Sequence, residues 1–268
     1  MTMKINLSDI SNARDIGGID TACGTIATGR LFRSGEHSRM TDKDQQTLAE
    51  CGLARVIDLR TAAEIANVPD RKIDGAEYVN IPIIQATTFG ISYESSDGPV
   101  IAEKLRQGIL RMRDKGETPE EHMRELYGRF VRNEFCREHI GQFVRTLADK
   151  PVAGATLWHC SAGKDRVGVC TAVLLHCLGA SKQQIVDDYM LTNTLTRDNM
   201  TSVANKVAPY VTDEVMNLML KMLYVDVSYI DTFFAECDRL YGGIDAFVAA
   251  TGITAEHKHK LVKNYIIK

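Results

Sequence analysis

Short apolar runs alternate along the chain with longer segments in which apolar residues recur every three to four positions. The apolar runs are typical of buried strands and lie at residues 54–59, 78–84 and 155–158. Helical spacing follows at residues 41–50, 62–68, 101–112, 119–149, 167–178 and 181–190, and it continues through the remainder to Lys268. Such alternation predicts an α/β protein with a mainly parallel central sheet flanked by helices, and no linker divides it, so we expect one domain over residues 1–268.

Local signals sharpen some of these boundaries. Thr41 and Thr61 are each followed three positions later by an acid, Asp44 and Glu64, which predicts two helix starts of the capping-box type. Pro82 places the run at 78–84 at an edge of the sheet, or ends the strand there. Residues 10–35 are punctuated by glycine and are expected to form loops and short strands, and the Gly-, Ser- and Thr-rich residues 85–99 are expected to form a mobile loop.

Composition excludes several classes of protein. The chain has 268 residues with 44% apolar side chains and a net charge of −3, which gives no basic field for nucleic acid. It holds no apolar run long enough for a transmembrane segment, and its first ten residues lack the apolar stretch of a secretory signal. Its seven cysteines show no C-x-x-C pair, which argues against a disulfide framework or a zinc site. We therefore expect a cytoplasmic protein, or one exported without a cleavable signal peptide, that needs no cofactor or metal.

The segment Trp158–Thr171, W-H-C-S-A-G-K-D-R-V-G-V-C-T, carries the candidate chemistry. An apolar strand precedes it and an apolar helix follows, so the motif lies on a strand-to-helix turn. Such a turn directs successive backbone N–H groups and the positive end of a helix dipole at one point, which forms an anion-binding site. Cys160 would have its thiolate stabilised by the same field. Arg166, at the helix start, could hold two oxygens of a tetrahedral oxyanion.

This combination fits phosphate-monoester hydrolysis through a phosphocysteine, with Cys160 as the nucleophile. The expected phosphate-binding residues are Ser161, Ala162, Gly163, Lys164, Asp165 and Arg166. Three other interpretations remain: a buried cysteine with a salt-bridging arginine nearby, a phosphate-binding module without turnover, and a sulfurtransferase or arsenate reductase.

The run H-C-S-A-G-K-D-R-V-G resembles the signature loop of cysteine-based phosphatases. Its Lys-Asp pair before the arginine is similar to that of the atypical bacterial phosphatases of phosphotyrosine and inositol lipids. Three further stretches match that family: N-A-R-D-I-G-G at 12–18, L-F-R-S-G at 31–35, and V-I-D-L-R at 56–60 together with Glu64. The resemblance implies a cysteine-phosphatase fold with extra C-terminal helices. It also implies phosphoprotein or phosphoinositide substrates and a helical lid within residues 190–226, although ordinary helix packing would explain the methionines there.

The general acid is expected to be Asp165, because the run at 81–85 is followed by no acid before Glu94 and Asp97, and the resemblance implies that the loop aspartate can serve. Asp97 is the reserve. Lys164 would bind extra anionic charge, and His159 would hold the loop backbone and tune Cys160.

Arg60 and Arg14 are candidate supporting residues, because Arg60 leaves the carboxyl end of a strand and Arg14 comes from a stretch that matches the family. Val167 departs from the superfamily, which usually has Thr or Ser after the arginine to help the thiolate leave. This departure leaves the nucleophilic step intact and puts the second step in doubt.

Overall fold

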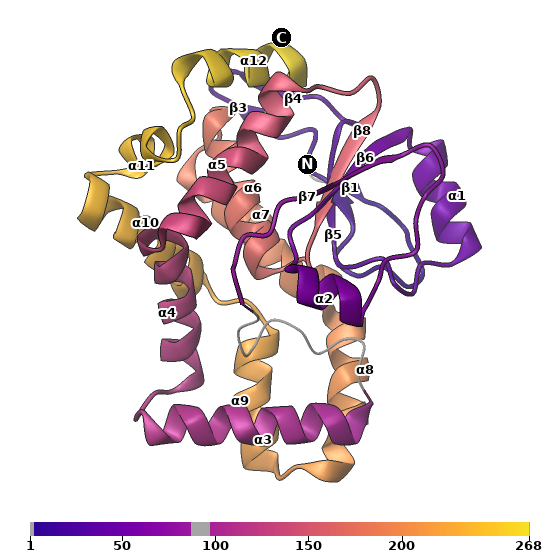
Figure 1. Ribbon diagram of the computed structural model, residues 1–268, viewed down its shortest axis with the longest axis vertical. Helices are drawn as coiled ribbons and strands as arrows, with labels where there is room; N and C mark the ends of the chain where they lie inside the picture. Colours follow the sequence, from indigo (N-terminus) through magenta and orange to yellow (C-terminus); the bar gives the residue numbers. More distant parts are fainter. Residues whose placement is uncertain (1–2, 87–96, 268) are drawn as a thin grey trace.

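The computed structural model describes residues 3–86 and 97–267, and its main sheet has six strands in the order β1-β2-β5-β8-β6-β7 (Figure 1). β8 pairs in parallel with β5 and β6, and β6 pairs in parallel with β7, whereas β1 and β2 run antiparallel. The expected α/β fold with a mainly parallel sheet is confirmed. The strands are Met3–Lys4 (β1), Arg14–Asp15 (β2), Leu31–Ser34 (β5), Leu53–Asp58 (β6), Glu77–Asn80 (β7) and Ala155–His159 (β8).

Helices surround this sheet. They are α1 (Asp42–Glu50), α2 (Ala62–Asn67), α3 (Gly98–Asp114), α4 (Pro119–Arg132), α5 (Glu134–Asp149), α6 (Asp165–Cys177), α7 (Lys182–Leu195), α8 (Arg197–Val207), the 3-10 turn η1 (Ala208–Tyr210), α9 (Asp213–Leu223), α10 (Val227–Tyr241), α11 (Ile244–Ala250) and α12 (Ala255–Tyr265). No helix among the described residues combines the length and the apolar character that crossing a bilayer requires.

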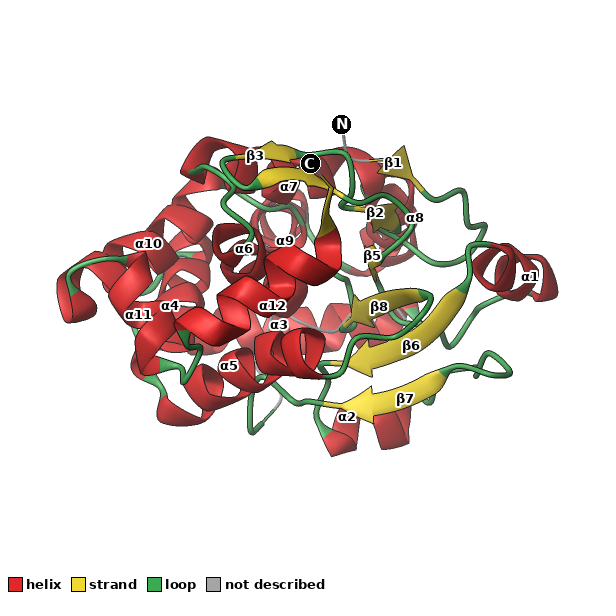
Figure 2. Ribbon diagram, turned by 90° about the horizontal axis from the view of Figure 1, so that it is seen from above, coloured by secondary structure: helices red, strands yellow, loops and turns green. Residues whose placement is uncertain are grey.

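The two faces of the sheet pack against different cores because successive strand residues point to opposite sides. Ile57 and Trp158 are fully buried in the larger core, which includes residues of α3 to α7 and α10. Val56 and Leu157, their immediate neighbours along the strands, belong to the smaller core with Leu48 of α1. Figure 2 shows α1 on the side of the strands away from α5, α6 and α10.

The two predicted capping boxes are confirmed. Thr41 and Thr61 each accept a hydrogen bond from the backbone N–H three residues on, and Asp44 and Glu64 each accept one in return from the cap backbone. The segment expected as one helix or a broken pair over 119–149 is a pair, because Asn133 ends α4 and its side chain caps α5.

Three boundaries differ from expectation. β7 ends at Asn80, before Pro82, and lies at the edge of the sheet as that proline suggested. The helix expected from Ile101 begins at Gly98, and residues 87–96 of the expected mobile loop lie outside the described residues. The C-terminus is not helical to its end, because β9 (Ile266–Ile267) pairs with β4 (Gly24–Ile26) in a small sheet that also contains β3 (Asp20–Thr21).

The parallel pairing brings the carboxyl ends of three strands to one place. His159 at the end of β8 is paired with Ser34 of β5 and with Asp58 of β6. In an open α/β sheet, ligands bind at this edge. The segment after His159 is therefore presented at the centre of the sheet's carboxyl edge, where chains from β5 and β6 also emerge.

Candidate active site

The loop from Cys160 to Arg166 joins β8 to α6 and is almost completely enclosed. Cys160 is 2% exposed, and Lys164 and Asp165 are equally buried. Gly163 has φ +67°, and a Cβ atom there would lie 2.3 Å from the carbonyl oxygen of Ser34, so only glycine fits. The tight turn therefore depends on one residue without a side chain, packed against the end of β5.

The carbonyl groups of this loop are turned outward. The Ser161 carbonyl accepts a hydrogen bond from the Glu36 backbone N–H at 3.0 Å. The Gly163 carbonyl accepts two, from Asn12 Nδ2 at 2.6 Å and from Arg33 Nη2 at 3.0 Å. Because the described peptides are trans, the N–H that follows each carbonyl points the opposite way. The amides after Ser161 and Gly163 are thus directed toward the inside of the loop, as an anion site requires.

Arg166 is held by Glu64 of α2. Its Nη1 and Nη2 donate to the two Glu64 oxygens at 2.7 and 2.9 Å, and Nη2 also lies 3.2 Å from the Ser161 hydroxyl. Burial alone would lower the pKa of Arg166, but Cys160 and Glu64 outweigh it and raise the pKa. The buried Nε atom has no hydrogen-bond partner among the described residues. The Nε–H is therefore available to an anion in the loop, while the carboxylate fixes the plane of the guanidinium.

Glu64 is a functional residue whose role the sequence reasoning missed. It was recognised as a helix cap and as part of the resemblance, but not as the partner of Arg166. The capping box supplied a sufficient local reason for an acid at that position, and no sequence spacing connects residues 64 and 166.

Arg14 and Arg33 form a buried network with Asp188 of α7. Arg14 Nε lies 2.9 Å from Asp188 Oδ1, and Arg33 Nη1 lies 2.6 Å from Asp188 Oδ2. Arg14 also bonds to Asn12, which in turn holds the Gly163 carbonyl. Arg14 therefore supports the loop through other residues, whereas Arg33, to which no role was assigned, touches the loop directly. The stretch L-F-R-S-G, which contains Arg33 and matches the family, could have indicated that this arginine lies at the site.

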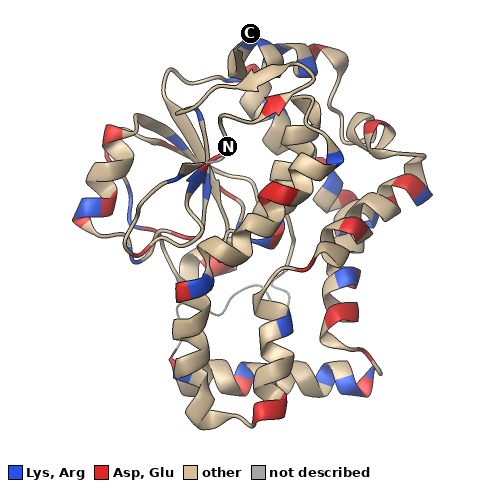
Figure 3. Cartoon of the chain, turned by 180° about the vertical axis from the view of Figure 1, so that it is seen from behind, with Lys and Arg blue, Asp and Glu red and all other residues tan. Residues whose placement is uncertain are grey.

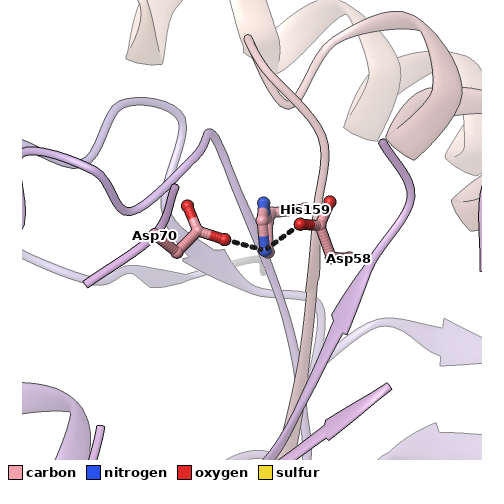
Figure 4. A group of neighbouring side chains, drawn as sticks. All are labelled: Asp58, Asp70 and His159. Carbon is pink, nitrogen blue, oxygen red and sulfur yellow. Dashed lines mark ion pairs between the residues drawn. The ribbon is translucent and has the colours of Figure 1, made fainter. Parts of the chain in front are cut away.

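His159 lies behind Cys160, with the carboxylates of Asp70 and Asp58 on either side of its Nε2 atom (Figure 4). Its Nδ1 is 3.2 Å from the Cys160 carbonyl oxygen, and its Nε2 is 3.2 Å from Asp70 Oδ2 and 4.0 Å from Asp58 Oδ2. The contact at Nδ1 is a hydrogen bond, whereas Nε2 makes ion-pair contacts to the two carboxylates without a hydrogen bond of good geometry, so charge attraction is what favours the protonated ring. Burial opposes this charge, but Asp58 and Asp70 outweigh burial and raise the pKa of His159. A positive charge thus lies directly behind Cys160.

Two neighbours complete this environment. Arg60 bonds to both aspartates, with Nη2 at 2.7 Å from Asp58 Oδ2 and 2.6 Å from Asp70 Oδ2, so it supports His159 and makes no described contact with the loop. His37 stacks on His159 with ring centroids 4.6 Å apart. Burial and the neighbouring His159 lower the pKa of His37 to about 3, so His37 stays neutral at neutral pH.

Asp58, Asp70 and His159 also have the composition of a metal site, with ligand atoms that all lie within 4.8 Å of one another. However, the guanidinium of Arg60 lies between the two carboxylates, and His159 supplies a second positive charge. Two cations therefore already balance two anions, and we interpret the group as an ion-pair network.

Asp165 and Lys164 face the helices that cover the loop. The Tyr127 hydroxyl of α4 donates to Asp165 Oδ1 at 2.9 Å, and the Tyr189 hydroxyl of α7 lies 2.6 Å from that of Tyr127. Burial and the Asp165 carboxylate raise the pKa of Tyr127 well above its ordinary value, so it remains a donor. Lys164 Nζ donates to the Met222 carbonyl at the end of α9 and lies 3.6 Å from Asp165 Oδ2.

Asp97, the reserve acid, lies elsewhere. It is the exposed N-cap residue of α3, and the next residue, Gly98, packs against the backbone of Lys206 near the end of α8. Among the described residues, no contact joins Asp97 to the loop.

The charge behind Cys160 leads to a test. Asp70→Asn removes one carboxylate, which lowers the pKa of His159, so His159 loses its proton at a lower pH and no longer stabilises the thiolate. Alkylation of Cys160 by iodoacetate at neutral pH should slow by about tenfold, the effect of one pKa unit. The difference should disappear in alkali, where His159 is neutral in both proteins. Peptide mass spectrometry measures the rate, with exposed Cys23 as internal standard and Asp74→Asn, an exposed neighbour, as matched control. An unchanged rate would show that Asp70 does not act on Cys160.

Comparisons with known proteins agree with this geometry. The model of the tyrosine phosphatase family matches residues 5–267. A Cupriavidus necator chain named as a tyrosine-protein phosphatase is 31% identical over 246 residues, which cover 89% of this chain and 80% of that one. The triple specificity protein phosphatase PtpB of Mycobacterium tuberculosis is 27% identical over 261 residues, 91% of this chain and 92% of PtpB. A Nostoc commune tyrosine-protein phosphatase is 27% identical over 169 residues, 62% of this chain and 49% of that one. The chain therefore belongs to the tyrosine phosphatase family and is a protein-tyrosine phosphatase.

Proposed function

We propose that this enzyme hydrolyses phosphotyrosine through a phosphocysteine formed on Cys160, and that phosphoserine, phosphothreonine and phosphoinositides are further substrates. The observation that carries the mechanism is the loop itself: Cys160 begins a turn whose carbonyls bond outward and whose arginine is held by Glu64. The wider substrate range rests on the sequence resemblance and on the printed name of the mycobacterial relative, a triple specificity phosphatase.

In the first step the Cys160 thiolate attacks phosphorus, and the bond to the tyrosine oxygen breaks as the sulfur–phosphorus bond forms. The loop amides and Arg166 stabilise the charge that spreads over the remaining phosphoryl oxygens. A general acid gives its proton to the departing phenolate oxygen. In the second step water attacks the phosphocysteine, loses a proton to the same group, and releases inorganic phosphate and the thiolate.

Asp165 is the proposed acid. It lies inside the loop and is fixed by Tyr127, whereas Asp97 caps an exposed helix start beside α8. Lys164, 3.6 Å from Asp165, is the other ionisable group in contact with it in the loop. These contacts favour Asp165 because an acid must reach the leaving oxygen from a fixed position.

The buried loop also supports the proposal of a helical lid within residues 190–226. The bond from Lys164 to the Met222 carbonyl ties the loop to α9, and Asn193 of α7 bonds to the backbone of Val225. With Cys160 only 2% exposed, a substrate reaches the sulfur only after some of these contacts open. Three of the methionines there, Met200, Met219 and Met222, are buried, as both a lid and ordinary helix packing would require.

A phosphate-binding module with little turnover remains the second candidate, and Val167 is the observation that favours it. Val167 is fully buried at the third position of α6 and offers no hydroxyl to the Cys160 sulfur.

Cys160→Ser should abolish hydrolysis of p-nitrophenyl phosphate while orthovanadate still binds, because serine keeps the loop but is a far weaker nucleophile. Steady-state kinetics and calorimetric titration with vanadate check the two parts. Cys170→Ser is the matched control, since that thiol is buried on α6 and burial raises its pKa well above the ordinary value. Residual activity of Cys160→Ser near that of the wild type would exclude a phosphocysteine.

Asp165→Asn should lower the rate on alkyl phosphates by about 10²–10⁴, the usual contribution of a general acid. The loss should be smaller with p-nitrophenyl phosphate, because nitrophenolate leaves without a proton. Comparison of kcat on the two substrates measures the contrast. If Asp97→Asn shows this pattern and Asp165→Asn does not, the acid is Asp97.

Val167→Thr should speed release of the thiolate in the second step. A hydrogen bond to a charged group contributes roughly 1.5–3 kcal/mol, and this corresponds to about ten- to a hundredfold in rate. Rapid mixing of the wild type with p-nitrophenyl phosphate should therefore give a burst near one nitrophenolate per site. Val167→Thr should shrink the burst and raise the steady rate. Val169→Thr, an equally buried valine of the same helix, controls for the buried hydroxyl. A wild type without a burst and a Val167→Thr variant that is no faster would show that another group already stabilises the thiolate.

A further inference from the structure

A cavity of about 390 Å³ lies between α3, α4 and the chain that follows β7. Its lining comes from the C-terminal half of α3, from one face of α4, from the start of α5 and from residues 84–86. None of these lining residues belongs to the Cys160–Arg166 loop. The volume lies within the range of about 300–1,000 Å³ that is common for small-molecule sites.

The floor of the cavity is apolar. Phe130 is fully buried, Leu126 is 3% exposed and Met112 is 4% exposed, and Ile84 and Cys136 are also buried. These side chains come from different segments and meet at one surface. A ligand that reached them would therefore need an apolar body to gain from the contact.

The rim of the cavity is basic. Arg111, Lys115 and Arg129 line it, all three are exposed, and none has an ion pair or hydrogen bond to another described residue through its side chain. Figure 3 shows basic residues gathered at the C-terminal end of α3. Other arginines of the same two helices are paired with carboxylates, namely Arg106 with Glu103, Arg113 with Glu214, and Arg132 with Glu125 and Glu236. Among the described residues, the basic side chains that face the cavity, Arg111, Lys115 and Arg129, are thus without a carboxylate partner.

Among the described residues that line the cavity, one carboxylate accompanies these three cations. Glu117 belongs to the lining, and its Oε2 lies 3.7 Å from Nδ1 of His122, another lining residue. Positive charge is therefore in excess, and an anionic group at the rim would be attracted by more than one basic side chain.

We propose that this cavity is a second, non-catalytic site that binds an amphipathic oxyanion, with a phosphate or carboxylate head at the basic rim and an acyl or aryl chain on the apolar floor. The proposal does not depend on the substrates or the mechanism proposed for Cys160. Tyr127, which holds Asp165, lies on a neighbouring face of α4 from Leu126, Arg129 and Phe130. A ligand in the cavity would thus leave the Cys160 loop open to its own anion.

The test is calorimetric titration of the full chain after saturation with orthovanadate, whose own binding is measured first. The probes are octylphosphonate and octanoate, which carry the same chain length on different heads. At least one should bind with one site per chain, and the tighter of the two identifies the head group. Inorganic phosphate and octanol, each lacking one half of the proposed ligand, should bind far more weakly. Raising the salt concentration should weaken binding of the anionic probe, because the cations are exposed.

The Arg111→Gln/Lys115→Gln/Arg129→Gln variant should bind the favoured probe about tenfold more weakly, because each exposed ion pair contributes only modestly to binding. Arg106→Gln/Arg113→Gln, which removes two paired arginines of α3, is the matched control and should bind as the wild type does. The proposal is overturned if neither probe binds, if octanol binds as tightly, or if the triple variant is unaffected. It is also overturned if vanadate abolishes binding of the probe, because the probe then occupies the Cys160 loop instead. If the triple variant does not fold, the salt dependence of probe binding to the wild type tests the role of the basic rim instead.

Discussion

The anion site that we propose in the Cys160–Arg166 loop depends on the outward direction of a few peptide carbonyls. If the Ser161 or Gly163 carbonyl turned inward, its partial negative charge would face the substrate phosphate in place of an amide. The groups that prevent this come from distant parts of the chain: the Glu36 amide follows β5, Arg33 lies within β5, and Asn12 precedes β2. The sheet order, with β8 between β5 and β6, brings those groups to the loop. Fold and chemistry are therefore coupled through hydrogen bonds to the loop backbone.

The residues around the loop also include buried charged groups, and their positive charges outnumber the negative charges that pair with them. Arg14 and Arg33 share the single carboxylate of Asp188, which leaves positive charge close to the loop. Burial and the neighbouring Arg14 lower the pKa of Arg33 to about 10, so it is still charged at neutral pH. Buried charge without a counter-charge is costly, by several kcal/mol per ion. In the proposed mechanism the substrate phosphate is an anion that would complete this balance, which would favour binding of the dianionic ester over that of its neutral product alcohol.

Features with local causes could be predicted from the sequence. The capping residues Thr41 and Thr61 act within one helical turn, and the alternation of strands and helices gave the parallel sheet. The contiguous run from Cys160 to Arg166, together with the three upstream stretches that match, predicted the family, and the family model over residues 5–267 confirms it.

The features that were not predicted depend on contacts between residues far apart in the sequence. Glu64 meets Arg166, and Asp70 meets His159, but neither pair has a characteristic spacing. The strand Ile266–Ile267 was missed for a related reason, because two residues show no alternation and their pairing partner is near the other end of the sequence. Residues 85–99 were expected to form a loop, whereas α3 already begins at Gly98, because a glycine and a proline at a helix start resemble a turn.

The pairing of β9 with β4 has a consequence for how the chain reaches its native state. Thr25 and Ile26 pair with residues 267 and 266, and the Ala27 amide bonds to the Tyr265 carbonyl, so these contacts span almost the whole sequence. Closing so long a loop has an entropic cost that the local helices do not bear. During synthesis on the ribosome, one edge of β4 has no pairing partner until residues 266 and 267 have emerged. This edge of β4 therefore lacks its partner until Ile267 has been made, and a chain without β9 carries an open edge strand at Gly24–Ile26.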